Sequence, residues 1–466
     1  MPITSRNPAT GETLAEFAAL SPGALDATLA LAAQAAPTWR RTPIAERAAV
    51  IRRLGDLLET EKARLGRLMT LEMGKPITAA IEEAAKCAVA CHYYAEHGPA
   101  IVADHPVADR GHHSFVAYDP LGVVLAVMPW NFPFWQAMRF IAPALVAGNV
   151  GLLKHASNVP QCALEIESLL VRAGAPRGVF QTLLIGSDAI AGLLADPRIA
   201  AATLTGSEEA GRHVGAAAGR HLKPTVLELG GSDAYIVMPS AALDTAIDTA
   251  VKARVINNGQ SCIAAKRFIV HREVSDRFLA GFVRGMQALR VGDPMQPETQ
   301  LGPLASAELA RELEDQVAKT LAMGARLLCG GRRDDPAGAW FPATVLTDIP
   351  RGSPAYDDEL FGPVGSVFVA EDLSDAIRIA NDTRFGLGAS AWTTDAAEQQ
   401  RLARELDAGT VMLNGMVASD PRFPFGGIKS SGYGRELGEL GMRAFTNVKT
   451  VRRRLTEEPT TPAARA

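Results

Sequence analysis

The chain has few cysteines and no long run of apolar residues. Its five cysteines among 466 residues form an odd and sparse set, which argues against a disulfide framework and fits a reducing cytoplasm. The apolar segments 123–128 and 140–150 are far too short to cross a bilayer, and the first residues carry no secretory signal pattern. We therefore expect a cytoplasmic protein with no membrane partner.

The chain also lacks a strong excess of charge and any cluster of metal ligands. A net charge of −4 gives no reason to expect binding to nucleic acid or to a membrane surface. Cys87 and Cys91 stand four residues apart, on one face of an expected helix. No second pair of ligands follows them, as a metal site would require. We therefore expect no metal, and we expect both thiols to lie in the core or on the surface.

The sequence does have the length and composition of an α/β protein with two or three domains. Apolar residues make up 47% of it and charged residues 21%, with 42 glycines and 29 prolines. Helical spacing of apolar residues predicts helices over 21–36, 44–71 and 83–94. Short apolar runs predict strands over 114–118 and 123–128.

Strands and helices then alternate along the chain. Strands are expected over 150–154, 179–185, 201–205 and 225–229, and helices over 160–172 and 206–219. Asn158 is the expected N-cap of the first of these helices. The alternation predicts a parallel, doubly wound sheet, whose ligands bind at the carboxyl ends of the strands.

A second α/β unit follows, and the end of the chain differs from it. Its expected elements are helices over 242–256 and 274–289, a strand over 268–270, and further periodic segments over 304–323, 366–368 and 373–381. The last residues, 456–466, are rich in Thr, Pro and Ala, so we expect them to be disordered.

Cys262 lies in the polar run Val255-Ile-Asn-Asn-Gly-Gln-Ser-Cys-Ile-Ala264. Core cysteines usually occupy apolar runs, whereas a nucleophilic thiolate needs exposure and nearby N–H groups that lower its pKa. A tight polar loop can supply both. For this segment alone, an inert structural cysteine is the alternative.

Four other residues at expected strand ends could serve the same chemistry. Asn131 could donate to a developing oxyanion or merely cap the next helix. Lys154 could reach ribose or phosphate oxygens or be a surface lysine. Gly206 could admit a pyrophosphate at a helix N-terminus or be an ordinary helix start. Glu228, in an apolar setting, would have a raised pKa and could act as a general base, or be an exposed strand end.

Two turn-rich loops with aromatic residues complete the pattern, Glu359-Leu-Phe-Gly-Pro363 and Phe423-Pro-Phe-Gly-Gly-Ile-Lys429. In their order and spacing, these segments resemble those of the aldehyde dehydrogenase superfamily. The resemblance runs from about residue 7 to residue 449, nearly the whole chain. It implies an α/β fold with a Rossmann-type cofactor domain, an α/β catalytic domain and a small β oligomerisation element.

The resemblance also implies where these parts lie. The cofactor-binding domain would comprise residues 1–103 and 121–230, and the catalytic domain residues 231–430. The oligomerisation hairpin and tail would comprise residues 104–120 and 431–455. A homodimer or homotetramer is the expected assembly.

Each residue that matches the family pattern takes an implied role. Cys262 would attack the aldehyde, while Asn131 and the Cys262 N–H would stabilise the oxyanion. Glu228 would activate the water that cleaves the resulting thioester. The implied cofactor-binding residues are Trp130, Lys154, Ser157, Gly206, Ser207, Glu359 and Phe361.

Two positions depart from the family pattern. Ser157 stands where many NAD-preferring members carry a glutamate that binds the adenosine ribose. A hydroxyl can donate to a 2′-phosphate that a carboxylate would repel, so we expect NADP to be preferred and NAD to be possible. Glu208 places an acid near the expected pyrophosphate, for which the sequence offers no physical reason.

Within the superfamily, the chain is most similar to bacterial succinate-semialdehyde dehydrogenases. Arg139 lies eight residues after Asn131, where such enzymes place a carboxylate-binding arginine; a structural salt bridge is the alternative. Ser419, and Trp135 as an apolar wall, would complete the pocket. One subgroup has a second arginine six residues before the nucleophile, where this chain has Ile256.

Other functions stay open beside the oxidation of succinate semialdehyde. The substrate could be a general aliphatic aldehyde or another ω-carboxy semialdehyde such as glutarate semialdehyde. A CoA-acylating enzyme is disfavoured by Glu228, which would direct the thioester to water. A non-catalytic, crystallin-like protein is disfavoured by the intact set of Cys262, Asn131 and Glu228.

Overall fold

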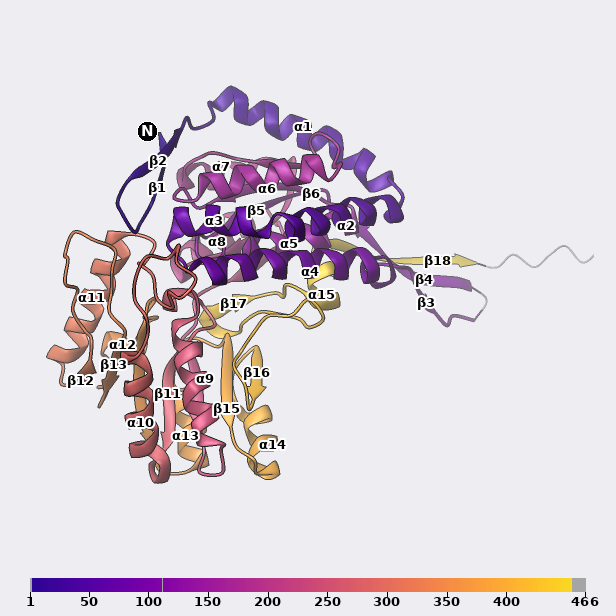
Figure 1. Cartoon of the computed structure of the whole chain (residues 1–466). Coiled ribbons are helices and arrows are strands. Elements are labelled where there is room, and N and C mark those ends of the chain that lie inside the picture. The colour runs from indigo at the N-terminus through magenta and orange to yellow at the C-terminus, as the bar shows by residue number, and fades with distance from the viewer. Residues whose placement is uncertain (1, 111, 455–466) are drawn as a thin grey trace, which may run out of the picture.

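The structure is a computed structural model that describes residues 2–110 and 112–454. The expected disordered tail, 456–466, lies outside the described residues. Sheets of six, seven and three strands organise the chain, and a small two-stranded sheet, Ile3–Arg6 with Thr13–Phe17, lies near its N-terminus. Figure 1 shows the two larger sheets in separate halves of the molecule and the three-stranded sheet projecting from its side.

The six-stranded sheet has the order β17-β9-β8-β5-β6-β7, and all its neighbours are parallel except β17, which runs antiparallel to β9. From β5 the chain passes outward to β6 and β7 and then returns to the other side of β5 as β8. This reversal of strand order is where doubly wound sheets bind ligands. The strands are β5 (Val123–Met128), β6 (Val150–His155), β7 (Phe180–Thr182), β8 (Ile199–Thr205), β9 (Thr225–Glu228) and β17 (Gly432–Tyr433).

Helices cover this sheet, so its central strands are nearly continuous apolar runs. Every residue of β6 is buried, and so is every residue of α5, which lies between the sheet and α4. The N-terminal elements are β1 (Ile3–Arg6), β2 (Thr13–Phe17), α1 (Pro22–Arg41), α2 (Ile44–Thr60), α3 (Lys62–Met73) and α4 (Ile77–Ile101). The others are α5 (Trp135–Ala147), α6 (Pro160–Arg172), η1 (Ser187–Ala189), α7 (Ile190–Ala195) and α8 (Glu208–Arg220).

The seven-stranded sheet has the order β12-β13-β14-β11-β10-β15-β16 and is parallel except for β12. Its strands are β10 (Asp233–Val237), β11 (Ala265–His271), β12 (Arg326–Cys329), β13 (Thr344–Thr347), β14 (Val364–Ala370), β15 (Gly388–Trp392) and β16 (Thr410–Leu413). Its helices are α9 (Leu243–Val255), η2 (Ile256–Gly259), α10 (Arg272–Gln287), α11 (Ala307–Ala322), α12 (Pro354–Asp357), α13 (Leu373–Asn381) and α14 (Ala396–Glu405).

The three-stranded sheet joins two segments that are far apart in sequence. Its strands are β3 (His105–Val107), β4 (His112–Pro120) and β18 (Thr446–Arg454), and β18 runs antiparallel to β4 along its whole length. Before β18 come η3 (Lys429–Ser431) and α15 (Gly438–Arg443). Most side chains of β18 are exposed, so this sheet leaves a face that the described chain does not cover.

Three details of the sequence prediction were wrong. Asn158 does not cap α6: Val159 occupies that position, and the Glu72 carboxylate accepts from the N–H groups of Gln161 at 3.0 Å and Cys162 at 2.8 Å. An acid from α3 thus replaces the local cap, because a helix N-terminus attracts negative charge from any part of the fold. Second, the helix expected over 44–71 is interrupted at Glu61. Third, five strands of the seven-stranded sheet were not predicted: β10, β12, β13, β15 and β16.

Within the described part of the chain, no helix is both long and apolar enough to span a membrane. The same residues contain no group of three or more side chains that could hold a metal ion. Cys87 and Cys91 are both fully buried on α4, so they are thiols of the core.

Candidate active site

Two cavities meet at Cys262. We call the first the substrate cavity; it has a volume of about 160 Å³ and lies between α4, α5, the loop around Cys262 and the segment 417–425. We call the second the cofactor cleft; it has a volume of about 260 Å³ and opens where β5, β8 and β9 end. The thiol therefore has access to two ligands from different sides.

The loop that carries Cys262 has a strained backbone held by side chains. Asn257 and Asn258 have φ angles of 55° and 58°, in the left-handed region that asparagine tolerates better than most residues. The Asn258 amide donates to the carbonyl oxygens of Gly74 at 3.0 Å and Pro303 at 2.8 Å. The position of the thiol is thus fixed by contacts with distant segments.

Lys266 and Arg254 bind the carbonyl groups of this loop, and the sequence did not reveal either residue. The Lys266 ammonium donates to the carbonyl oxygens of Ser261 and Cys262, both at 2.8 Å, and Arg254 donates to that of Gly259 at 2.7 Å. Among the described residues, the Cys262 N–H donates no hydrogen bond to another backbone group. That N–H is therefore free to bind a ligand oxygen.

Asn131 lies in the loop after β5, on the wall of the cofactor cleft. Its side-chain amide donates to the Gln260 carbonyl at 3.1 Å, and the backbone carbonyl of Asn131 accepts from the Asn257 amide at 2.7 Å. A primary amide has two N–H bonds, so one remains for a ligand. Together with the Cys262 N–H, this is the donor set that an oxyanion requires.

The thiol of Cys262 is not pre-ionised, contrary to the sequence expectation. Burial raises its pKa to about 12, against the opposing influence of Arg139 and Lys266. The polar sequence around Cys262 pointed the other way, but its polar side chains are used to hold the loop. A base must therefore remove the thiol proton before the sulfur can attack.

Glu228 is buried at the end of β9, and it lines neither cavity in this conformation. Neither of its carboxylate oxygens has a hydrogen-bond partner among the described residues. Burial, and then the charge of Glu436, raise its pKa well above the usual value. This environment favours the neutral acid, and Glu228 must turn toward Cys262 to act on a proton there.

Arg139 lines the substrate cavity but already has an acidic partner. Its Nε atom lies 2.8 Å from a carboxylate oxygen of Glu436, and both side chains are almost fully buried. Its guanidinium also donates to Thr205 at 3.3 Å and lies 4.7 Å from the centre of the Phe425 ring. The structural salt bridge considered from the sequence is therefore present; a substrate contact by Arg139 stays a prediction.

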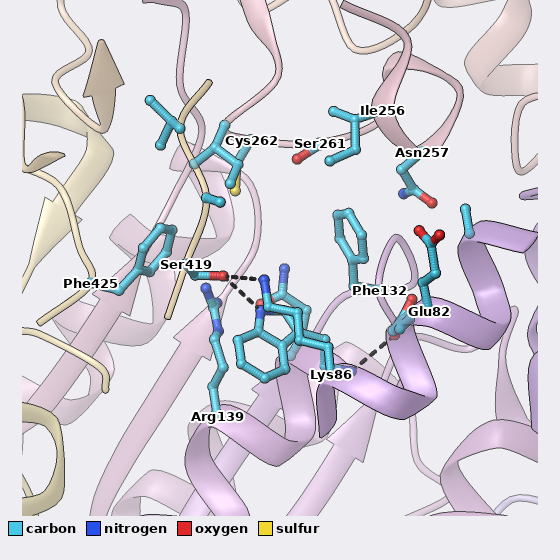
Figure 2. A pocket seen from close by; sticks show the side chains of 17 residues that line it. Glu82, Lys86, Phe132, Arg139, Ile256, Asn257, Ser261, Cys262, Ser419 and Phe425 are labelled. Atoms are coloured by element: carbon cyan, nitrogen blue, oxygen red, sulfur yellow. Dashed lines mark hydrogen bonds between the residues drawn. The ribbon is translucent and has the colours of Figure 1, made fainter. Parts of the chain in front are cut away.

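Ser419 and Trp135 line the same cavity, together with Lys86, which the sequence analysis missed. The Ser419 hydroxyl accepts from the Lys86 ammonium at 2.9 Å and from the Trp135 indole at 3.1 Å. Figure 2 shows Lys86 and Ser419 pointing toward one another. The only sequence signal for Lys86 was a lysine on the apolar helix α4.

Five of the seven expected cofactor-binding residues line the cofactor cleft: Trp130, Gly206, Ser207, Glu359 and Phe361. The rings of Trp130 and Phe361 meet edge to face, with centroids 5.8 Å apart. Glu359 is held by the Gly231 N–H and by Lys266, each at 3.1 Å. The Ser207 hydroxyl caps α8 by accepting from Ala210.

The sequence profile of the aldehyde dehydrogenase family matches residues 1–451. The chain belongs to the aldehyde dehydrogenase family. It is 55% identical to succinate-semialdehyde dehydrogenase [NADP(+)] 1 of Mycobacterium tuberculosis strain H37Rv, over 97% of this chain and 99% of the relative. A succinate-semialdehyde dehydrogenase [NADP(+)] of Mycobacterium avium is also 55% identical, over 97% and 96%.

Solved structures of aldehyde dehydrogenases share the fold. The succinic semialdehyde dehydrogenase of Streptococcus pyogenes, crystallised with NADP+ as the cofactor, superposes with a TM-score of 0.94 at 36% identity, over 96% of this chain and 99% of that one. The enzyme of Burkholderia pseudomallei gives 0.94 at 33% identity, over 98% and 95%. The fold class predicted from the sequence is thereby confirmed.

The cleft of this aldehyde dehydrogenase suits a nicotinamide nucleotide. Trp130 and Phe361 supply an aromatic wall, the Glu359 carboxylate can accept from ribose hydroxyls, and the N-terminus of α8 can bind a phosphate. Lys154 lies within β6 and is buried, whereas Ser157 lies two residues after β6 and is exposed; neither lines this cleft. Their contacts with the cofactor stay predictions.

Glu208 has a partner that explains its presence. One carboxylate oxygen lies 2.9 Å from Arg384, and the other pairs with Arg212. Two arginines thus balance its charge, and the acid does not line the cofactor cleft. Its repulsion of a bound phosphate is reduced accordingly.

His155 is another residue that sequence reasoning missed in this aldehyde dehydrogenase. Its Nε2 atom lies 2.8 Å from the Pro133 carbonyl, and its Nδ1 atom accepts from the Ala156 N–H at 2.9 Å. Burial lowers its pKa to about 4, so the ring is neutral at pH 7. It ties the end of β6 to the loop that carries Asn131.

Proposed function

We propose that the protein oxidises succinate semialdehyde to succinate with NADP+ as the preferred cofactor and NAD+ as a possible one. The observation that carries this proposal is the position of the Cys262 thiol between the cofactor cleft and a small cavity with cationic side chains. The succinate-semialdehyde dehydrogenase [NADP(+)] enzymes of Mycobacterium, 55% identical to this chain, support the same reaction.

The chemistry starts at the Cys262 sulfur. Once a base has removed its proton, the thiolate adds to the aldehyde carbon and forms a hemithioacetal. The second Asn131 N–H and the Cys262 N–H stabilise the negative oxygen. Both donors are held in place, because the first Asn131 N–H is bonded to the Gln260 carbonyl and the Cys262 carbonyl accepts from Lys266. Bound NADP+ supplies the hydride acceptor that turns this adduct into a thioester.

Glu228 completes the cycle in this proposal. In its buried position Glu228 is favoured as the neutral acid, because burial raises its pKa well above the usual value. After it turns toward Cys262 and ionises, its carboxylate takes a proton from water. The water then attacks the thioester, the carbon–sulfur bond breaks, and the thiol is restored as the acid leaves. The net reaction consumes an aldehyde, water and NADP+ and produces a carboxylate, NADPH and protons.

In the proposal, cofactor choice depends on two residues at the end of β6 and just after it. Ser157 brings a hydroxyl, and Lys154 adds positive charge nearby, whereas a carboxylate would repel a 2′-phosphate. No acid lines the cofactor cleft apart from Glu359 among the described residues. These features support NADP+ over NAD+.

A wider substrate range is the second candidate, and one pair of observations favours it. Arg139 is paired with Glu436, and Ile256 stands where a second arginine occurs in some relatives. Glutarate semialdehyde or uncharged aliphatic aldehydes would then also be accepted. A non-catalytic role is not supported by a site in which the nucleophile and the oxyanion donors come together.

The test is a panel of aldehydes assayed with each nicotinamide cofactor. We expect the highest kcat/KM for succinate semialdehyde with NADP+, a lower value for glutarate semialdehyde and the lowest for butanal. An equal or higher value for butanal would reduce the proposal to a general aldehyde dehydrogenase. An equal or higher value with NAD+ would overturn the cofactor assignment.

The assembly and its location are part of the proposal. The exposed face of β18 beside β4 suits pairing with another copy of the chain, so we propose a homodimer or homotetramer. Light scattering at several concentrations would test it, and a monomer would contradict it. All five cysteines are free, which fits a cytoplasmic enzyme.

A further inference from the structure

The substrate cavity contains a lysine that nothing in the proposed reaction yet uses. Lys86 projects from α4, with its ammonium 2.9 Å from the Ser419 hydroxyl and 4.4 Å from the centre of the Trp135 ring. Figure 2 shows it beside the cavity that ends at Cys262. The ammonium is thus held at a fixed position within reach of a bound substrate.

The hydrogen bonds around Ser419 leave donors free. An ammonium and an indole N–H can only donate, so the Ser419 oxygen accepts from both Lys86 and Trp135. Both of its lone pairs are then used, and its own proton must point elsewhere. The ammonium of Lys86 keeps two further N–H bonds. Lys86 and Ser419 together therefore offer donors to an acceptor in the cavity.

The charges around Lys86 leave it without an acidic partner. Glu83 forms an ion pair with Lys75, and its carboxylate also accepts from the N–H groups at the start of α5. Asp420 is paired with Arg422 at 2.6 Å. Among the described residues, no carboxylate lies within ion-pair distance of the Lys86 ammonium. Glu82, four residues before Lys86 on α4, points toward Asn257 and not toward Ser419 in Figure 2.

Arg139 differs from Lys86 in this respect. Its charge is balanced by Glu436 at 2.8 Å, and a carboxylate ligand would have to compete with that partner. A cation that has no partner gains more from a bound carboxylate than one that is already paired. The two cations of the cavity thus have unequal capacity to bind an acidic substrate.

We propose that Lys86, with Ser419, binds the far carboxylate of the substrate and is the main determinant of specificity for ω-carboxy semialdehydes. This inference rests on the proposed function, since it concerns the same cavity. Arg139 then acts as the counter-ion of Glu436. The one cationic anchor expected from the sequence lies on α4 rather than on α5.

The ionisation of Lys86 fits this role. Burial, and then the charge of Arg139, lower its pKa to about 8. The charged ammonium is still the main form at pH 7. Because the free enzyme stabilises this charge only weakly, a bound carboxylate can stabilise it further. The charged groups that face it are Glu83 on α4, Arg139 on α5 and Asp420 in the loop after Ser419.

The test compares two substrates in the full-length enzyme with Lys86→Met and Lys86→Arg. We expect Lys86→Met to raise KM for succinate semialdehyde on the order of 30-fold or more, the lower end of the effect of removing one partner of a buried charge pair. The rise for butanal should be at least several-fold smaller. Lys86→Arg should restore much of the lost affinity for succinate semialdehyde.

Two further measurements separate the outcomes. Succinate should bind more weakly to Lys86→Met than to the wild type, whereas butyrate binding should change little, and this comparison of inhibitors does not depend on turnover of an aldehyde. A folded variant should still bind NADP+. Arg139→Gln should reduce activity toward both aldehydes in parallel. Equal losses for both aldehydes in Lys86→Met, or an Arg139→Gln defect confined to succinate semialdehyde, would overturn the inference.

The result for the wild-type enzyme distinguishes the inference from the proposed function. If the wild type does not prefer succinate semialdehyde to butanal, the proposed function fails, whatever Lys86 does. If the wild type has that preference and Lys86→Met keeps it, only the role of Lys86 fails.

Discussion

The cofactor cleft and the substrate cavity share Cys262 but are built from different parts of the fold. The cleft lies at the carboxyl ends of β5, β8 and β9, so short loops after parallel strands supply its wall. The cavity lies between helices α4 and α5 and the segment 417–425. Its polar groups are the ends of long side chains.

This difference affects how each region can change. A loop after a strand is tied to the sheet at a fixed place, and any doubly wound sheet offers the same crevice. The ends of Lys86 and Arg139 are placed by their partners instead, Ser419 for one and Glu436 for the other. Substrate preference can therefore change by substitution of single side chains, while the cofactor position stays the same.

Loss of the shared thiol should separate the two regions most completely. Cys262→Ala should lower aldehyde oxidation on the order of 10⁵-fold or more, the scale for removing a catalytic nucleophile. Binding of NADP+, followed by calorimetry, should persist because the cleft keeps its other walls. Cys329→Ala, which removes a half-buried thiol in β12, is the matched control. Substantial activity in Cys262→Ala would refute the mechanism.

Glu228→Gln should affect the second half of the reaction. Because the base is needed to hydrolyse the thioester, steady turnover should fall roughly 10²- to 10⁴-fold. Rapid mixing should then show a burst of NADPH equal to the enzyme concentration, since the acylation step persists. The amide has the same shape as the acid, so folding should be preserved. Normal turnover without a burst would remove Glu228 from this role.

The sequence predicted residues that line both regions, but not the partners that hold them. Cys262, Asn131 and Glu359 line the cofactor cleft, and Arg139, Trp135 and Ser419 line the substrate cavity. The partner of Arg139 could not be found in the same way, because Glu436 comes from a segment almost 300 residues further along the chain. A long-range ion pair leaves no local pattern.

The thiol pKa and Lys86 show the same limit. The polar residues before Cys262 predicted a lowered pKa, but the folded chain uses their side chains for loop contacts, and the pKa of the partly buried thiol is raised. In the sequence, Lys86 does not differ from any other lysine on a helix. Its position in the cavity is evident only from the contacts of Ser419 with Lys86 and Trp135 in the folded chain. Burial and tertiary hydrogen bonds decide such roles, and neither is a local property.

Cofactor choice should change by a smaller factor. Ser157→Glu should shift the ratio of kcat/KM for NADP+ to that for NAD+ toward NAD+ roughly 10- to 100-fold, equivalent to about 1.4–2.8 kcal/mol. The cause is repulsion between the new carboxylate and the 2′-phosphate. Ser157→Gln, similar in length and uncharged, should shift the ratio much less. Equal shifts in both variants would show that bulk, and not charge, is responsible.

The smallest expected effect is a pH dependence confined to the substrate cavity. The pKa of Lys86 is lowered to about 8, so its ammonium form is present below that pH and is lost above it. A single group with this pKa is about 90% protonated at pH 7 and about 10% at pH 9. The kcat/KM for succinate semialdehyde, divided by that for butanal, should therefore fall up to about tenfold over this range.

Taking the ratio removes the titration of groups that both substrates need, including Cys262 and Glu228. The titratable and charged groups that face Lys86 are Arg139 on α5, Cys87 and Glu83 on α4, and Asp420. Lys86→Arg should flatten the profile, because a guanidinium stays charged. If the ratio keeps its fall in Lys86→Arg, the titrating group is another one, and the cavity owes its preference for acidic aldehydes to a different cation.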